Sequence, residues 1–162
     1  MKSTEAALDK TDYGYCEVYP EIEAALNYAM SSGFSGPLAV WGSSYSAALV
    51  FQLGAKNEPS VDAILGFSPA SGGPLAECAP SLYLAELSVP ALALRPQSEF
   101  ENPSVQKQME EFELHGVETY VADPGVHGSS MLVAKRVDGS TEKTWRVVLD
   151  FLAKTLDVKP ED

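Results

Sequence analysis

The sequence is poor in positive charge and has no long apolar run. It carries 11 Lys and Arg residues against 23 Asp and Glu residues, which gives a net charge of −12. The phosphates of nucleic acids and of anionic membranes repel such a chain, so we expect neither as a partner. No stretch reaches the roughly 18 consecutive apolar residues of a transmembrane helix, so we expect no membrane span.

Cysteine and histidine, the common ligands of structural zinc, are also scarce. The two cysteines, Cys16 and Cys78, lie too far apart for paired metal ligands, and we predict no metal or cofactor. Free thiols in a reducing compartment are the expected state, with a single disulfide as the alternative. The opening MKSTEAALDKTD lacks the apolar core of a signal peptide, so we expect a cytoplasmic protein.

The apolar content, 45% of the 162 residues, suffices for the core of one domain. Residues 1–19 are polar and without a clear period, which predicts an irregular lead-in. Residues 20–162 carry regular patterns, which predicts that they form the folded domain.

Short apolar runs alternate with helical patterns through that domain. Strands are predicted at 37–42, 61–69, 89–96 and 117–125, and helices at 20–33, 45–56, 102–116 and 140–156, with a short helical turn at 82–87. Strands that alternate with helices indicate an α/β fold with a parallel sheet of about four strands flanked by helices.

Two of the helices have informative apolar faces. The helix at 45–56 is apolar nearly all round, which predicts that it is buried. In the helix at 140–156, Trp145, Val148, Leu149 and Leu152 are expected to face the core.

Three loops that leave strand ends hold candidate catalytic residues. Ser44 follows the first strand in WGSSYSAAL, Glu99 and Glu101 follow the third, and His127 follows the fourth. The carboxyl ends of parallel strands share one edge of a sheet, so these loops are expected to meet. Asp123 is a further candidate for the acid.

These residue types suit nucleophilic catalysis. A serine hydroxyl needs a neighbouring imidazole to take its proton, and a carboxylate behind the imidazole fixes its tautomer. The backbone N–H of Tyr45, at the start of the next helix, is positioned to stabilise an oxyanion. We therefore expect Ser44, an acid and His127 to act together on a small-molecule substrate.

The chain resembles the C-terminal half of the α/β-hydrolase family, and most closely its esterase and dienelactone-hydrolase-like members. GSSYS at 42–46, the strand VPALALRP that leads to Glu99, and HGSSM at 127–131 carry the resemblance, which covers roughly residues 20–157. It implies an esterase with Ser44 as nucleophile, His127 as general base and acid, and Glu99 as the acid.

The sequence departs from the family in two ways. Ser46 replaces the second glycine of the usual Gly-x-Ser-x-Gly turn. The strands that precede the nucleophile strand are absent, and with them the loop that usually donates the second oxyanion N–H. The resemblance therefore implies a truncated fold in which the strand at 37–42 has an open side, and we expect a homodimer through that edge or through uncovered apolar helix faces.

Three alternatives stay open at this stage. The first is a non-catalytic remnant of the family that acts as a dimeric binding or scaffold domain. The second is a flavodoxin-like binding module without hydrolase ancestry. The third is that the sequence is a fragment of a longer gene product.

Overall fold

Strands β2 (Ala63–Phe67) and β3 (Ala91–Pro96) form the centre of a parallel sheet in the computed structural model, which describes residues 14–156. Strand β1 (Ala39–Ser43) pairs with β2, and β4 (Glu118–Ala122) pairs with β3. The order is β1-β2-β3-β4, and all pairs are parallel. The α/β class and the four predicted strands are confirmed.

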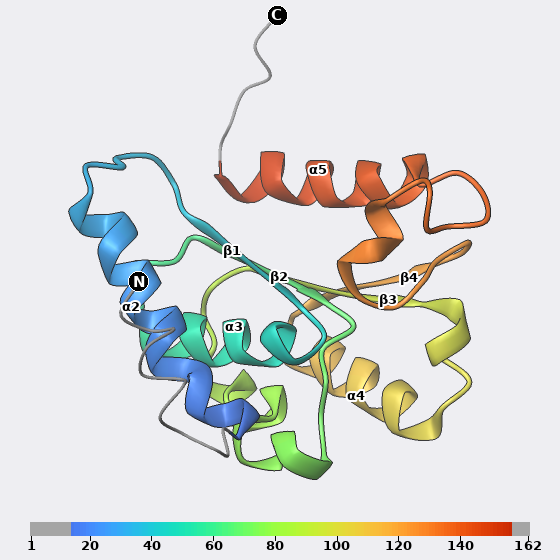
Figure 1. Cartoon of the computed structure of the whole chain (residues 1–162), viewed down its shortest axis with the longest axis horizontal. Helices are drawn as coiled ribbons and strands as arrows, with labels where there is room; N and C mark the ends of the chain where they lie inside the picture. The colour runs from blue at the N-terminus through green and yellow to red at the C-terminus, as the bar shows by residue number, and fades with distance from the viewer. Residues whose placement is uncertain (1–13, 157–162) are drawn as a thin grey trace, which may run out of the picture.

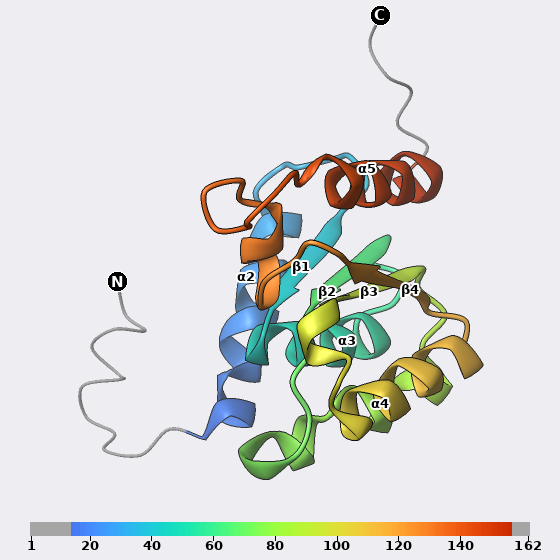
Figure 2. The same cartoon turned by 90° about the vertical axis from the view of Figure 1, so that its right-hand side faces the viewer.

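Helices cover both faces of this sheet (Figures 1 and 2). Helices α3 (Tyr45–Lys56) and α4 (Pro103–Leu114) lie on one face, and α5 (Glu142–Leu156) lies on the other. Helix α2 (Tyr19–Ser31) lies beside β1. Of the predicted lead-in, residues 1–13 lie outside the described residues; Tyr15–Val18 forms a short 3-10 helix, and α2 follows directly.

The core has two layers because successive side chains of each strand point to opposite faces. Ile64 packs with Phe51 and Phe112 on the side of α3 and α4. Leu65 packs on the α5 side, with Val148 and Phe151. Both central strands are buried along their whole length, as expected for strands covered on both faces.

The helix boundaries follow their sequence signals closely. Helix α3 spans the predicted 45–56, and its residues from Ala47 to Gly54 are buried. The Asn102 side chain caps α4 by accepting a hydrogen bond from the Ser104 N–H, and Pro103 occupies the first turn.

One face prediction was wrong. Leu149 is 55% exposed and Trp145 is 39% exposed, whereas Val148 and Phe151 are buried. Helix α5 is therefore rotated so that Phe151 takes the place expected for Leu149. The Trp145 indole remains at the edge of the core, where its N–H donates to the Leu132 carbonyl.

The expectation of free thiols was also wrong, because Cys16 and Cys78 form a disulfide. The bond joins the 3-10 helix before α2 to the 3-10 helix Gly73–Cys78, in the long connection between β2 and β3. Their sequence separation is 62 residues, so the bond closes a long loop of chain. Within residues 14–156, no helix is long and apolar enough to cross a membrane.

The passage from β1 to α3 depends on the absence of a side chain at Gly42. A Cβ placed there would lie 2.3 Å from the Ser46 carbonyl oxygen and 2.6 Å from the Ala47 backbone. These atoms belong to the first turn of α3, so the strand and the helix approach each other as closely as backbones allow.

We predict that Gly42→Ala lowers the free energy of unfolding by about 1–3 kcal/mol, because the new methyl group meets backbone rather than a mobile side chain. Gly36→Ala is the matched control, since a Cβ at Gly36 meets no atom within 4 Å. Urea unfolding measures both. Equal stabilities of the two variants would contradict the close approach.

We predict that the double variant Cys16→Ser, Cys78→Ser unfolds with a free energy about 2–5 kcal/mol lower than the wild type. Urea unfolding of the oxidised wild type and of the variant gives the difference. Intact-mass spectrometry of the wild type before and after reduction must show the gain of two hydrogen atoms that the opening of one disulfide produces. Two titratable thiols in the native protein would refute the bond.

Candidate active site

Ser44 lies at the sharp turn between β1 and α3 with a backbone that L residues rarely adopt. Its φ is 60° and its ψ is −119°. The turn is held from both sides: the Ser44 N–H donates to the Phe67 carbonyl at 2.9 Å, and its carbonyl accepts from Ala47 and Ala70. A non-glycine residue in this region costs of order 1–3 kcal/mol, and such residues cluster at functional sites.

Tyr45 is the first residue of α3. Its backbone N–H is among the four at a helix start that no residue of the same helix can accept. It lies at the positive end of the helix dipole, one residue after Ser44.

Ser46, which replaces the second glycine of the turn, closes the end of β1. Its hydroxyl donates to the Ser43 carbonyl at 2.8 Å and accepts from the Ser43 N–H at 2.9 Å. A glycine could make neither hydrogen bond. The serine therefore satisfies both backbone groups of the last residue in β1.

Glu99 and His127 lie in direct contact at the same edge of the sheet. Glu99 ends a 3-10 helix that follows β3, and its Oε1 lies 2.5 Å from Nδ1 of His127. The alternatives, Glu101 and Asp123, are exposed. No hydrogen bond within residues 14–156 joins either of them to His127.

Two further residues hold Glu99, and the sequence analysis did not identify them. Arg95 donates to Oε2 of Glu99 at 2.5 Å, and the Ser68 hydroxyl donates to Oε1 at 3.0 Å. Ser68 is buried, has a φ of 51°, and also accepts from the Gly128 N–H at 2.9 Å. It thus connects the acid to the loop that carries His127.

Arg95 is a buried cation inside an otherwise apolar strand, and 5% of its surface is exposed. Its guanidinium also donates to the Pro69 carbonyl and to Oε1 of Gln108 on α4. Its Nε is buried and has no hydrogen-bond partner within residues 14–156. A buried charge is tolerated only when it is paired, so Glu99 stabilises Arg95 as Arg95 stabilises Glu99.

These contacts control the ionisation of Glu99. Burial by itself would raise the pKa of Glu99, but hydrogen bonds from His127, Arg95 and Ser68, with the charge of Arg95, hold that pKa below its usual value. Glu99 is therefore ionised at neutral pH. An ionised carboxylate can accept a hydrogen bond from the imidazole and stabilise it when it becomes charged.

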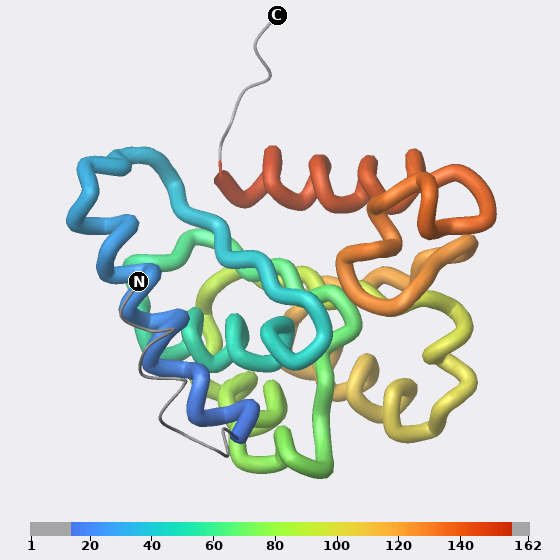
Figure 3. The backbone as a smooth tube through the Cα atoms, in the orientation of Figure 1, coloured from blue at the N-terminus to red at the C-terminus, as the bar shows by residue number. Residues whose placement is uncertain are grey.

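The loop of His127 lies beside the end of β1 (Figure 3). The Ser129 N–H donates to the Ser43 hydroxyl at 3.0 Å, which anchors the two segments to each other. The His127 side chain is 61% exposed. No hydrogen bond in the described part of the chain joins it to the Ser44 hydroxyl. Such bonds are often long before a substrate binds.

The structure thus brings together Glu99 and His127 from two loops and places the loop of His127 beside the end of β1, which Ser44 follows. The sequence did not single out Arg95 and Ser68, because an arginine near a strand end and a serine in a loop are both common in proteins without any functional role. Their positions directly at the carboxyl ends of β3 and β2 were the available signal. Within residues 14–156, no cluster of His, Cys, Asp or Glu side chains suits a metal ion.

No protein-family model and no curated protein sequence matches the chain. Several solved structures do match the chain. Uncomplexed acylaminoacyl peptidase of Pyrococcus horikoshii matches with a TM-score of 0.63 and 16% identity, over 96% of this chain and 30% of the peptidase. Its orthorhombic form gives a TM-score of 0.57 and 15% identity, over 91% and 28%.

An acylaminoacyl peptidase in complex with Z-Gly-Gly-Phe-chloromethyl ketone also matches, with a TM-score of 0.55 and 17% identity. The match covers 87% of this chain and 27% of that one. The chain therefore spans less than a third of these structures. None of these neighbours points to the esterase and dienelactone-hydrolase members that the sequence resembled. Together with the four parallel strands and their helices, the similarities show that the chain has an α/β-hydrolase-like fold.

Proposed function

We propose that the chain is a serine hydrolase that cleaves carboxylic esters through an acyl-enzyme. Ser44 is the nucleophile, His127 the general base and acid, and Glu99 the acid that orients His127. The observation that carries the proposal is the strained backbone of Ser44 at the turn from strand to helix. That turn presents a serine hydroxyl at the carboxyl edge of a parallel sheet.

The proposed reaction has two halves. In the first, Ser44 Oγ attacks the carbonyl carbon of the ester while Nε2 of His127 takes its proton, and the alcohol leaves with that proton. In the second, His127 takes a proton from water while the water oxygen attacks the acyl carbon. The bond from that carbon to Ser44 Oγ then breaks, His127 returns the proton to Oγ, and the carboxylic acid leaves. The backbone N–H of Tyr45 stabilises the oxyanion in both halves.

Arg95 and Ser68 act through Glu99 in this proposal. With its Oε1 and Oε2 both engaged, Glu99 cannot rotate away from His127. Its lowered pKa keeps it ionised at neutral pH, so that it can accept the hydrogen bond from Nδ1 of His127.

Acylated peptides are a second candidate substrate class. The structures that resemble this chain are acylaminoacyl peptidases, and one is a complex with Z-Gly-Gly-Phe-chloromethyl ketone. Amide cleavage uses the same nucleophile, base and oxyanion donor, with protonation of a leaving amine in place of an alcohol. Comparing ester and amide substrates of the same acyl group distinguishes the two classes.

The competing role is that of a non-catalytic binding or scaffold domain with the same ancestry. The observation that favours this role is that the His127 side chain is 61% exposed and makes no hydrogen bond to Ser44 within the described residues. Loss of one oxyanion donor typically lowers turnover by about a hundredfold to a thousandfold. A weak but Ser44-dependent activity therefore supports the hydrolase, whereas its complete absence supports the scaffold.

A cytoplasmic location was expected from the sequence and stays a prediction. The Cys16–Cys78 disulfide is the observation that argues against it, because cytosolic thiols are usually kept reduced.

We predict that the folded protein hydrolyses p-nitrophenyl butyrate and that Ser44→Ala lowers kcat/KM by about a thousandfold or more. Ser35→Ala, in an exposed loop outside the site, is the matched control and should retain full activity. Release of p-nitrophenol at pH 7.5 measures the rates, and circular dichroism verifies the fold. Equal activity of Ser44→Ala and wild type would exclude Ser44 as the nucleophile.

We predict that Glu99→Gln lowers kcat/KM for the same ester by about a hundredfold to ten-thousandfold, because an amide no longer fixes the tautomer of His127. Glu101→Gln is the control and should change the rate less than twofold, about the effect of an exposed residue without contacts. If both variants match the wild type, Glu99 is not the acid.

A further inference from the structure

The segment that includes β1 contains no charged residue. Between Glu23 and Lys56, residues 24–55 include no Asp, Glu, Lys, Arg or His, in a chain whose net charge is −12. This segment comprises most of α2, the loop to β1, β1 itself and most of α3. We refer to its exposed part as the uncharged face.

Large apolar side chains are exposed on this segment. Phe34 is 73% exposed and Tyr28 is 71% exposed; Met30, Trp41 and Tyr45 are exposed as well. Single exposed apolar residues are ordinary, but a group of them without an interspersed charge marks an interaction surface.

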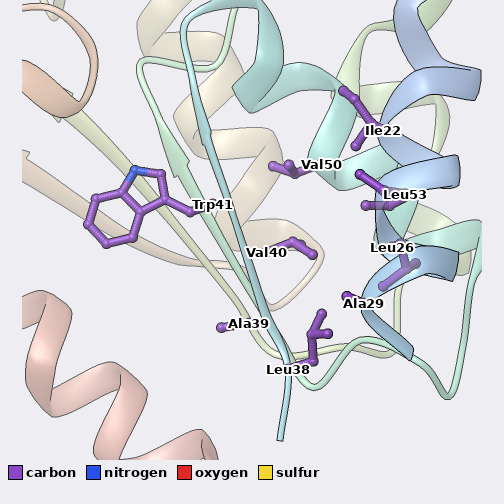
Figure 4. Close-up of a pocket in the computed structure, with 10 residues that line it drawn as sticks. Ile22, Leu26, Ala29, Leu38, Ala39, Val40, Trp41, Val50 and Leu53 are labelled. Carbon is purple, nitrogen blue, oxygen red and sulfur yellow. The ribbon is translucent and has the colours of Figure 1, made fainter. Parts of the chain in front are cut away.

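A groove with apolar walls lies between α2 and β1 of this segment (Figure 4). Its volume is about 290 Å³, and its walls include Ile22, Leu26 and Ala29 of α2 with Leu38, Val40 and Leu53. These side chains point into the groove, whereas Trp41 points away to the opposite face of the sheet. The groove therefore runs along the face of β1 that is turned toward α2.

The edge of β1 is itself open. β1 pairs with β2 alone, so the backbone groups on its other side have no strand partner among the described residues. Proteins usually protect such edges with charged side chains, proline within the strand or a covering element. β1 is Ala39-Val40-Trp41-Gly42-Ser43 and contains neither a charge nor a proline.

We propose that a second copy of this chain binds to the uncharged face and covers the groove and the edge of β1. Two observations identify the second copy as the occupant. The unpaired edge of β1 is complementary to the same edge of a second copy, because two such edges can exchange backbone hydrogen bonds across a two-fold axis. In addition, two chains of charge −12 repel each other, and an edge strand without a charged side chain allows close approach at the lowest electrostatic cost.

This interface adjoins the proposed catalytic turn. β1 ends at Ser43, and Ser44 follows it directly, so a copy that covers the edge of β1 lies beside the nucleophile. The proposal does not rest on catalysis, because the uncharged face is the same in a hydrolase and in a scaffold. Its test is the oligomeric state, which an inactive protein reports equally well.

Sedimentation velocity of the wild-type protein over a hundredfold concentration range tests the proposal. We expect a reversible dimer of twice the 17.4 kDa chain mass. A monomer at every concentration overturns it. Co-purification of the monomer with a different polypeptide would also overturn it, because the face would then have another occupant.

Two exposed positions locate the interface. Phe34→Glu adds a charge to the uncharged face at a side chain that contributes little to folding, and we expect the dimer dissociation constant to rise tenfold or more. Leu114→Glu adds the same charge at the end of α4, where Leu114 is 84% exposed, and should leave the constant unchanged. If Leu114→Glu weakens the dimer and Phe34→Glu does not, the interface lies elsewhere and the proposal fails.

Discussion

The close approach of β1 and α3 at Gly42 is the constraint on which the arrangement of the candidate site depends. The chain turns from strand to helix within one residue, Ser44, whose φ is 60°. This turn brings the Ser46 carbonyl and the Ala47 backbone into the space that a side chain at Gly42 would occupy, so the turn requires glycine there. The same turn places Ser44 at the carboxyl end of β1, and the N–H of Tyr45 is among the four at the start of α3 that have no partner within the helix.

A second constraint is the balance of charge behind His127. Arg95 is buried in β3, and its guanidinium requires a carboxylate partner, which Glu99 supplies. Glu99 in turn is held at a fixed place, where it also contacts His127. Ser68 joins this pair to the backbone of Gly128, so the loops after β2, β3 and β4 meet in one network. The acid is thus part of the structural core as well as of the candidate site.

Features encoded by local sequence could be predicted, whereas those that depend on packing could not. The bounds of α3, the cap at Asn102 and the four strands follow from apolar period and capping residues. The orientation of α5, which exposes Leu149, depends on how Phe151 packs against the sheet. The apolar period of the helix alone does not determine whether Leu149 or Phe151 faces the core. The Cys16–Cys78 bond joins segments that no local pattern brings together.

The same distinction applies to the site. Ser44, Glu99 and His127 could be proposed because each follows a strand, and parallel strands end at one edge. Arg95 and Ser68 could not, because their roles arise only when three loops converge. The open edge of β1 was expected from the resemblance, and the sheet order shows it. The proposed dimer rests on this edge and on the charge-free segment that contains it.

The central claim is that Ser44 is built to act as a nucleophile. Treatment of the folded protein with a fluorophosphonate, followed by peptide mass spectrometry, tests it most directly. The account predicts one phosphonyl adduct on the Ser44 hydroxyl, and its absence when His127 is replaced by alanine. A folded protein that takes no adduct, or takes it on another serine, would contradict the account.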